Sequence, residues 1–252
     1  MKIGAQLYTL REFCTTPEDF AQTLQKVAQI GYTTVQVSGT CDFDGAWLKT
    51  QLDRCGLTAT VTHVKPDRLI NETEQTLKQH QAFGCRRIGI GAAPGGISDE
   101  TYDKFVSVFR PVAETLYTAG TKFYYHNHWK ELTRASDGTP FLEKLCRDFP
   151  ADRLGIIFDT YWAQYAGADP AYWIERLRGR VDCVHLKDMT CVDKVHRMMP
   201  IGEGNMNWEG ILHACEGAGT EYAYVEQDNC NGEDPFECMR RSYRYLHSLG
   251  LD

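Results

Sequence analysis

Four segments from residue 122 onward carry side chains that bind metal ions or transfer protons in many enzymes. These side chains are His126 and His128 in 122–128, Asp159 in 154–160, His185 and Lys187 in 181–188, and Glu226 in 222–228. Residues two apart on a strand share a face, so the two members of each pair can point the same way. Two carboxylates with imidazole nitrogens suit Mn²⁺, Zn²⁺, Co²⁺ or Fe²⁺, whereas pure oxygen sites favour Mg²⁺ or Ca²⁺.

These residues need a scaffold, and short apolar or β-branched segments recur along the whole chain. There are eight such segments, at 3–7, 34–38, 58–64, 87–92, 122–128, 154–160, 181–188 and 222–228. Their starts are about 31 residues apart on average, the length of one strand-helix-strand unit.

Helical patterns fill the intervals, most clearly at 17–30, 99–119, 208–218 and 235–248. In 17–30 the apolar residues recur at helical spacing, with Thr16 as the expected N-cap and Gly31 as the expected stop. Pro111 is expected to bend or to break the helix at 99–119.

Eight such units in 252 residues predict the α/β class and a (β/α)8 TIM barrel, with residues 1–252 as a single domain. The alternative is an open doubly wound sheet, which usually has a glycine-rich phosphate loop after its first strand. Here the first strand is followed by YTLREFCTTP, which contains no glycine. In a barrel the C-terminal strand ends meet at one site, so the histidines and carboxylates named above should converge there, together with Gln6 and His63. Carboxylates gathered in this way repel one another without a counter-ion, and we therefore predict one divalent metal, with Mn, Zn, Co, Fe and Mg left open.

Composition narrows the functional classes. The chain has 27 basic and 34 acidic residues and a net charge of −7, which opposes a nucleic-acid partner. No segment approaches the ~20 apolar residues of a membrane span, and the N-terminus has no signal-peptide core, so a cytoplasmic location is expected. The ten cysteines include no CxxC pair and are interpreted as free thiols in a reducing compartment.

Six short motifs resemble the sugar phosphate isomerase/epimerase family, the xylose-isomerase-like barrels that also include inosose dehydratase and endonuclease IV. The motifs are IGAQLYTLR, YHNH at 125–128, FDTYWA at 158–163, HLKD at 185–188, PIGEGNMNW at 200–208 and VEQD at 225–228. The resemblance implies a metal held by Glu, Asp, His and Glu from strands 5 to 8. The last three correspond to Asp159, His185 and Glu226, whereas His126 stands at the first Glu position. We predict His126 as the fourth ligand, with His128 and Glu131 as alternatives.

This resemblance implies an enzyme, a metal-dependent isomerase or epimerase that acts through a metal-bound enediolate. Glu226 would move the proton, with Glu131 or Lys187 as its partner. The alternative is a carbon–oxygen lyase, a keto-sugar or inosose dehydratase, in which a protonated His128 or Lys187 assists the leaving hydroxyl. Replacement of the strand-5 Glu by His126 removes one of the paired carboxylates that epimerases use. The lyase therefore stays an alternative.

The expected substrate is a small carbohydrate or cyclitol. Its expected binding residues are His63, His128, Trp129, Arg197, Glu203 and Gln6, and Tyr8, Tyr161 and Trp162 are further candidates for the pocket wall. Two other classes compete with this interpretation, a non-catalytic sugar-binding module and a metal-dependent DNA-repair nuclease. The second would need a basic groove, which the net charge argues against. Self-association into a homo-oligomer stays open, because barrels of this kind often dimerise.

Overall fold

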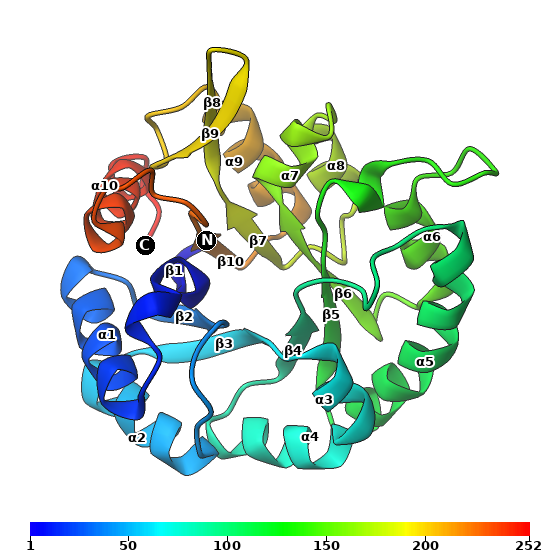
Figure 1. Cartoon of the computed structure of the whole chain (residues 1–252), viewed down its shortest axis with the longest axis horizontal. Helices are drawn as coiled ribbons and strands as arrows, with labels where there is room; N and C mark the ends of the chain where they lie inside the picture. The colour runs from blue at the N-terminus through cyan, green and yellow to red at the C-terminus, as the bar shows by residue number, and fades with distance from the viewer.

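The computed structural model describes residues 1–252, and eight parallel strands close into a barrel (Figure 1). The strands are β1 (Lys2–Gln6), β2 (Thr34–Val37), β3 (Thr58–His63), β4 (Arg87–Ile90), β5 (Lys122–His126), β6 (Leu154–Asp159), β7 (Cys183–Leu186) and β10 (Tyr222–Val225). Each strand pairs with its neighbours in chain order, and β10 pairs with β1 to close the ring. The predicted barrel is confirmed, and the open doubly wound sheet is excluded.

Helices follow the strands and surround the barrel (Figure 1). The long or regular ones are α1 (Pro17–Ile30), α2 (Gly45–Cys55), α4 (Thr73–Ala82), α5 (Asp99–Thr118), α6 (Phe141–Asp148), α9 (Trp208–Ala218) and α10 (Pro235–Ser248). The shorter ones are η1 (Leu7–Phe13), α3 (Pro66–Asn71), η2 (Lys130–Leu132), α7 (Thr160–Tyr165) and α8 (Pro170–Arg176). Thr16 caps α1 as expected, since its hydroxyl accepts the Asp19 N–H at 3.1 Å, and Gly31 follows the last helical residue. Pro111 is exposed within α5, which continues through it without the break considered above.

Inside the barrel, large side chains from one strand pack over glycines of the next. Val61, Tyr124, Ile157, Cys183 and Tyr224 form this inner cluster. A Cβ on Gly155 would lie 2.2 Å from the Tyr124 ring, and the neighbouring strand therefore needs glycine at this position. These residues fill the barrel, so the polar side chains of a site can gather only at its ends, and those of Arg87, Asp182 and Glu221 at the N-terminal end pair with one another. The candidate site residues gather at the C-terminal ends of the strands.

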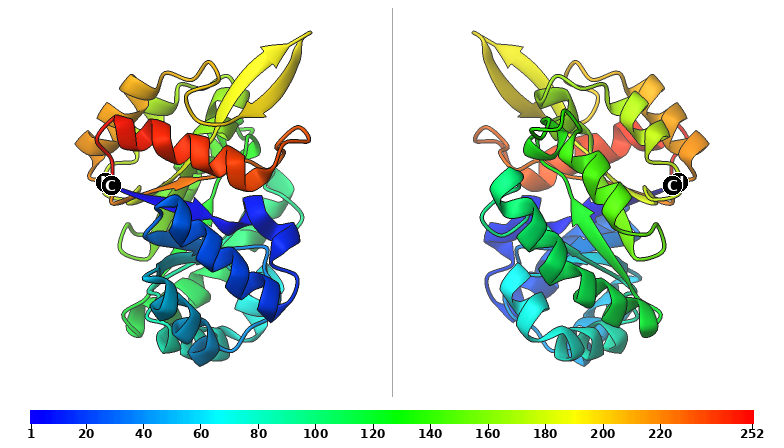
Figure 2. Two further views of the ribbon diagram at one scale, coloured as in Figure 1. Left: turned by 90° about the vertical axis from the view of Figure 1, so that its left-hand side faces the viewer. Right: turned by 90° about the vertical axis from the view of Figure 1, so that its right-hand side faces the viewer.

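A two-stranded antiparallel hairpin, β8 (Asp188–Val192) and β9 (Val195–Met199), follows β7 and projects beyond the barrel (Figure 2). Its turn residues Asp193 and Lys194 have φ of 52° and 66°, the left-handed values that a tight two-residue hairpin turn requires. The sequence interpretation placed a single strand at 181–188 and a loop after it, and so missed the hairpin.

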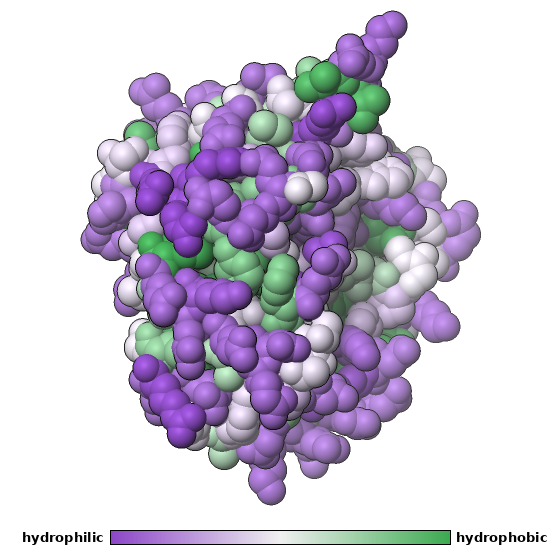
Figure 3. Space-filling view, turned by 60° about the vertical axis from the view of Figure 1, so that its left-hand side comes forward, coloured by the Kyte–Doolittle hydropathy of each residue, from purple (hydrophilic) through white to green (hydrophobic).

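The remaining sequence expectations concern the surface and the cysteines. All ten cysteines are unpaired, as expected, and Cys14, Cys85, Cys183, Cys215 and Cys238 are buried. No helix combines the length and the apolar character that crossing a bilayer requires. The face in Figure 3 is mostly hydrophilic, with hydrophobic side chains in small separate groups.

Candidate metal centre and the cavity beside it

Four side chains from adjacent strands meet at the C-terminal end of the barrel. His126 ends β5, Asp159 ends β6, His185 lies in β7, and Glu226 directly follows β10. All four are buried, and one possible ligand atom from each lies within 4.8 Å of the others. The strand register explains the cluster, because Asp159 pairs with His185 across β6 and β7. These are the four residues predicted as metal ligands, and we call them the metal cluster.

Both histidines of the metal cluster are oriented by a hydrogen bond on the far side of the ring. His126 donates from Nδ1 to the carbonyl oxygen of Gly91 at 3.0 Å, which turns Nε2 toward Asp159 Oδ2 at 3.2 Å. His185 donates from Nε2 to Gln36 Oε1 at 2.7 Å, which leaves Nδ1 2.8 Å from Glu226 Oε2. In metal sites, the same arrangement of the second ring nitrogen fixes the tautomer and aims the ligand.

This donor set fits a divalent cation. Burial alone would lower the pKa of His185, but Glu226 and Asp159 outweigh it and raise that pKa, so without a metal a proton lies between His185 and these carboxylates. A divalent cation would replace that proton. His185 Nδ1 and Glu226 Oε2 are both buried without a well-directed hydrogen bond. Two nitrogens and two carboxylates suit Mn²⁺, Fe²⁺, Co²⁺ or Zn²⁺. The residues present can therefore hold the metal that the sequence predicts.

Lys187 lies directly against the metal cluster. Its Nζ is 3.1 Å from Asp159 Oδ2, 2.8 Å from Glu226 Oε2 and 3.0 Å from Asp228 Oδ2. Burial alone would lower the pKa of Lys187, but Asp159, Glu226 and Asp228 outweigh it and raise that pKa well above its usual value. Lys187 is therefore an ammonium ion.

The carboxylates of the metal cluster respond in the opposite direction. Burial alone would raise the pKa of Glu226, but Lys187 and His185 outweigh it and lower that pKa below its usual value. The pKa of Asp159 is also lowered, because Lys187 and His126 outweigh the effect of burial. Both carboxylates are therefore ionised at neutral pH.

Asp228 is a site residue that the sequence interpretation did not single out. Burial, followed by the nearby Glu226 charge, raises the pKa of Asp228 to about 6. The available signal was its position in the VEQD motif, two residues after Glu226, although Asp228 lies beyond the end of β10.

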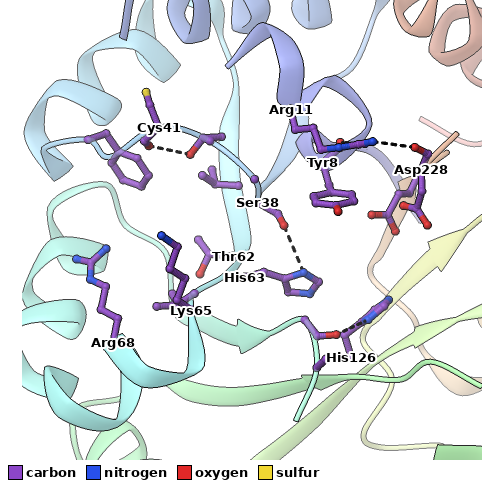
Figure 4. Close-up of a pocket in the computed structure, with 18 of the residues that line it drawn as sticks. Tyr8, Arg11, Ser38, Cys41, Thr62, His63, Lys65, Arg68, His126 and Asp228 are labelled. Atoms are coloured by element: carbon purple, nitrogen blue, oxygen red, sulfur yellow. Dashed lines mark hydrogen bonds between the residues drawn. The ribbon is translucent and has the colours of Figure 1, made fainter. Parts of the chain in front are cut away.

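A cavity of about 610 Å³ opens beside the metal cluster (Figure 4). Its size is ordinary for a small-molecule site. His63, His126, His128, Lys187 and Glu226 line it, as expected of site residues. Tyr8 and Trp162, two of the expected wall residues, line it as well.

The two further histidines lie close to the metal cluster. The His63 ring centroid is 5.2 Å from that of His126 and 5.6 Å from that of His185, and Ser38 Oγ lies 3.4 Å from its Nδ1 (Figure 4). Burial, together with nearby His126, lowers the pKa of His128 to about 3. His128 is therefore neutral, so Lys187 is the charged proton donor of the two considered for the leaving hydroxyl.

Glu131, a candidate proton partner and alternative ligand, is turned away from the metal cluster. It lies in η2, is buried, and accepts hydrogen bonds from the Tyr125 hydroxyl at 2.6 Å and the His128 N–H at 2.7 Å. Both of its carboxylate oxygens are thus used to hold the segment after β5. It does not line the cavity.

The other four predicted binding residues also lie outside the cavity lining. Trp129 is 40% exposed, and Arg197 is exposed on β9. Glu203 pairs with Arg241 at 2.9 Å. Gln6 is buried at the end of β1, where its Oε1 accepts the Tyr8 N–H.

Comparisons with known proteins agree with this fold. An inosose dehydratase of Geobacillus thermodenitrificans (strain NG80-2) is 20% identical over 90% of this chain and 88% of its own length. A crystal structure of a sugar phosphate isomerase/epimerase from Parabacteroides distasonis ATCC 8503 superposes with a TM-score of 0.81, at 23% identity over 98% of this chain and 93% of the other. The "probable 3-DHS dehydratase AsbF" from Bacillus anthracis gives a TM-score of 0.76, at 17% identity over 98% and 99% of the two chains. The model of one family matches residues 24–248, and the chain therefore belongs to the xylose isomerase-like TIM barrel family.

Proposed function

We propose that this chain is a divalent-metal-dependent enzyme that isomerises or epimerises a small keto-sugar or cyclitol. The observation that carries the proposal is the buried metal cluster, which opens on a sugar-sized cavity and has Lys187 beside Glu226. The bound cation would polarise the carbonyl oxygen of the substrate and so acidify the neighbouring carbon.

Glu226 is the proposed base. Its carboxylate is ionised, lines the cavity and can accept the proton as the C–H bond next to the carbonyl breaks. The electron pair of that bond then forms an enediolate of the substrate. Return of the proton to the neighbouring carbon gives the isomer. Donation of a proton to the opposite face of the same carbon, for which Lys187 is the proposed donor, gives the epimer.

Lys187 has two proposed tasks. Its ammonium keeps Glu226 ionised before the reaction, because the two groups lie 2.8 Å apart. It also lines the cavity, where it can donate a hydrogen bond to an oxygen of the enediolate.

Dehydration of a keto-sugar or inosose is the second candidate, and the position of Glu131 favours it. Because Glu131 is held by Tyr125 and His128, it does not face Glu226 across the metal cluster as a second base. In this reaction Glu226 takes the proton, the adjacent C–O bond breaks, and the leaving hydroxyl receives a proton from Lys187 to depart as water. Two curated relatives carry the name inosose dehydratase, at 20% and 22% identity.

Glu226→Gln tests the step that both candidates share. The amide keeps an oxygen for the metal but loses its basicity, so we expect retained metal and a ~10²–10⁴-fold loss of turnover on a panel of keto-sugars and inososes. The wild-type protein should exchange the substrate proton with D₂O, as measured by NMR, and the variant should not. Glu203→Gln is the matched control, because Glu203 pairs with Arg241 outside the cavity. Full activity of Glu226→Gln would contradict the assignment.

A further inference from the structure

The cavity extends beyond the metal cluster into a part that the proposed reaction does not use. This part, which we call the basic lobe, is lined by Thr40, Phe43, Lys65, Arg68 and Gln79. Lys65 and Arg68 come from the end of the β3 segment and from α3, and Figure 4 shows both side chains reaching into the hollow.

The guanidinium of Arg68 is held by a neutral partner. Its Nη2 donates to Gln79 Oε1 at 2.6 Å, and the Gln79 amide in turn donates to the carbonyl oxygen of Phe43. The nearest carboxylate is that of Glu72, whose oxygen lies 3.7 Å from Arg68 Nε and whose side chain is 49% exposed. Gln79 thus positions the guanidinium without cancelling its charge.

Lys65 makes no ion pair and no side-chain hydrogen bond. It shares the cavity lining with Arg68, so the basic lobe holds two cations, of which only Arg68 has a carboxylate nearby, that of Glu72 at 3.7 Å. A lone exposed lysine would mean little, but two cations on one cavity wall define a site for a negative group.

Two of the three acidic residues of the cavity are paired outside this lobe. Glu226 and Asp228 are both paired with Lys187, which leaves Asp42 as the remaining acidic lining residue. Arg11 adds a further cation, and its guanidinium donates only to the backbone carbonyls of Tyr8 and Asp228. The positive lobe stands out because the chain as a whole carries a net charge of −7.

We propose that the substrate carries an anionic group, a carboxylate or a phosphate ester, which Lys65 and Arg68 bind while the keto end lies at the metal cluster. This inference rests on the proposed function and specifies its substrate class. Lys65 and Arg68 suit this role, because a binding group away from the reacting carbon can orient the substrate without taking part in the reaction.

Binding of unreactive polyols tests the basic lobe directly. The Mn²⁺-loaded protein would be titrated calorimetrically with glucitol, glucitol 6-phosphate and gluconate. We expect at least one of the two anions to bind ~10-fold or more tightly than glucitol, and the stronger of the two identifies phosphate or carboxylate as the preferred group. This preference should weaken at high salt, because the lobe is open to solvent.

Matched variants separate the lobe from direct binding of the anion to the metal. Lys65→Gln and Arg68→Gln should each reduce the affinity for the preferred anion by ~10-fold, with little change for glucitol. Lys78→Gln and Arg54→Gln are the controls, because both residues lie outside the cavity lining. Circular dichroism and the unfolding midpoint would verify that each variant is folded.

Two results would overturn the inference: equal affinity for all three polyols, or an anion preference that survives in the Lys65→Gln/Arg68→Gln double variant. The proposed function fails separately. Loss of the anion preference in the double variant, without any D₂O exchange in the wild type, supports the basic lobe and contradicts the proton-abstraction chemistry. D₂O exchange without an anion preference supports the proton-abstraction chemistry and contradicts the role of the basic lobe.

Discussion

Hydrogen bonds on the outer sides of two histidine rings determine which nitrogens face the metal cluster. Gly91 provides one acceptor through its backbone, which no side-chain substitution removes. Gln36 provides the other through its side chain, and it comes from β2, on the far side of the barrel from β7. A residue distant in sequence thus positions His185.

We predict that Gln36→Leu weakens metal binding by ~10–100-fold, because the His185 ring loses the acceptor that fixes its tautomer. Competition with a metal-binding dye would measure the affinity. Gln79→Leu is a suitable control, because Gln79 contacts Arg68 rather than the metal cluster. An unchanged affinity in folded Gln36→Leu would show that His185 needs no such partner.

The residue at position 126 tests isomerase against lyase. His126→Glu would place a third carboxylate in the metal cluster and a second candidate base beside the cavity. We expect it to raise epimerase activity and to lower dehydratase activity, with the products followed by NMR. His196→Glu, on the exposed β9, controls for the added charge. If the natural protein forms only stereoisomers and the variant is no faster, position 126 does not decide the reaction.

The strand-end pattern located the metal cluster because it depends only on local polarity and strand period. Asp159, His185 and Glu226 each end an apolar segment, and β pairing aligns those ends. Glu131 could not be placed in this way. Its direction depends on the Tyr125 hydroxyl, a contact that no periodic pattern encodes. Lys65 and Arg68 were missed because they lie just after a strand, in a segment whose path only the folded chain defines.

At the scale of elements, one buried carboxylate organises the loop between β9 and α9. Asp188 accepts hydrogen bonds from the backbone N–H groups of Met189, Gly202, Gly204 and Met206 and from Trp208 Nε1. Asp188 directly follows Lys187, so the loop that it holds also fixes the backbone beside the metal cluster. The close packing leaves no space at Gly204, where a Cβ would lie 2.2 Å from Asp188 Oδ1.

We predict that Gly204→Ala destabilises the protein by about 2 kcal/mol or more, because either Asp188 or the loop must move and buried hydrogen bonds are lost. Urea unfolding would measure the change. Gly217→Ala in α9 is the control, since its added Cβ meets only Arg178 at 3.6 Å, and alanine favours helix. Equal effects of the two substitutions would contradict the role given to Asp188.

The hairpin illustrates where element prediction fails. The segment 188–199 is interrupted by charged residues, and its apolar stretches are too short for a core strand. Most of β9 is exposed. Its strands are paired by backbone hydrogen bonds and joined by a turn at Asp193 and Lys194. This Asp-Lys pair is not one of the Asn-Gly or Asp-Gly pairs typical of such turns. A strand without a buried face has no hydrophobic period to detect.

At the scale of the whole molecule, the stability should depend on pH through a buried histidine of α4. His80 lies against β3, with Nε2 2.8 Å from Thr62 Oγ1 and Nδ1 2.7 Å from the Thr76 carbonyl oxygen. Burial lowers the pKa of His80 from 6.5 to about 4. Between those values the unfolded chain binds a proton that the folded chain does not, so the free energy of unfolding falls as the pH falls.

We predict that the protein has its full stability with respect to His80 above pH 6.5, and that the free energy of unfolding is about 2 kcal/mol lower by pH 5. Urea unfolding at several pH values, for the wild type and for His80→Gln, would isolate it as the difference between the two pH slopes. His213→Gln is the control, because His213 is exposed on α9. Identical slopes for wild type and His80→Gln would contradict the buried neutral state.

The barrel itself was predictable, because its evidence is distributed over the entire chain. Each strand-helix unit repeats the same pattern, so an error in one unit leaves the count intact, and the eight predicted segments coincide with the eight barrel strands. A site has no such redundancy. Helix α5 also depends on more than one local signal, because its packing against the barrel outweighs the helix-breaking tendency of Pro111.

The contacts of Lys187 have a consequence for the order in which the protein is assembled. An ammonium ion within 3.1 Å of three carboxylates acts as a resident counter-charge, so the chain can fold before any metal is loaded. We expect chelator-treated wild type to unfold cooperatively, whereas Lys187→Met should lose about 3–5 kcal/mol without metal and recover on addition of Mn²⁺. Scanning calorimetry with and without chelator would show it, and a wild type that unfolds on chelation would refute it. Metal supply would then limit the activity of this protein rather than its abundance.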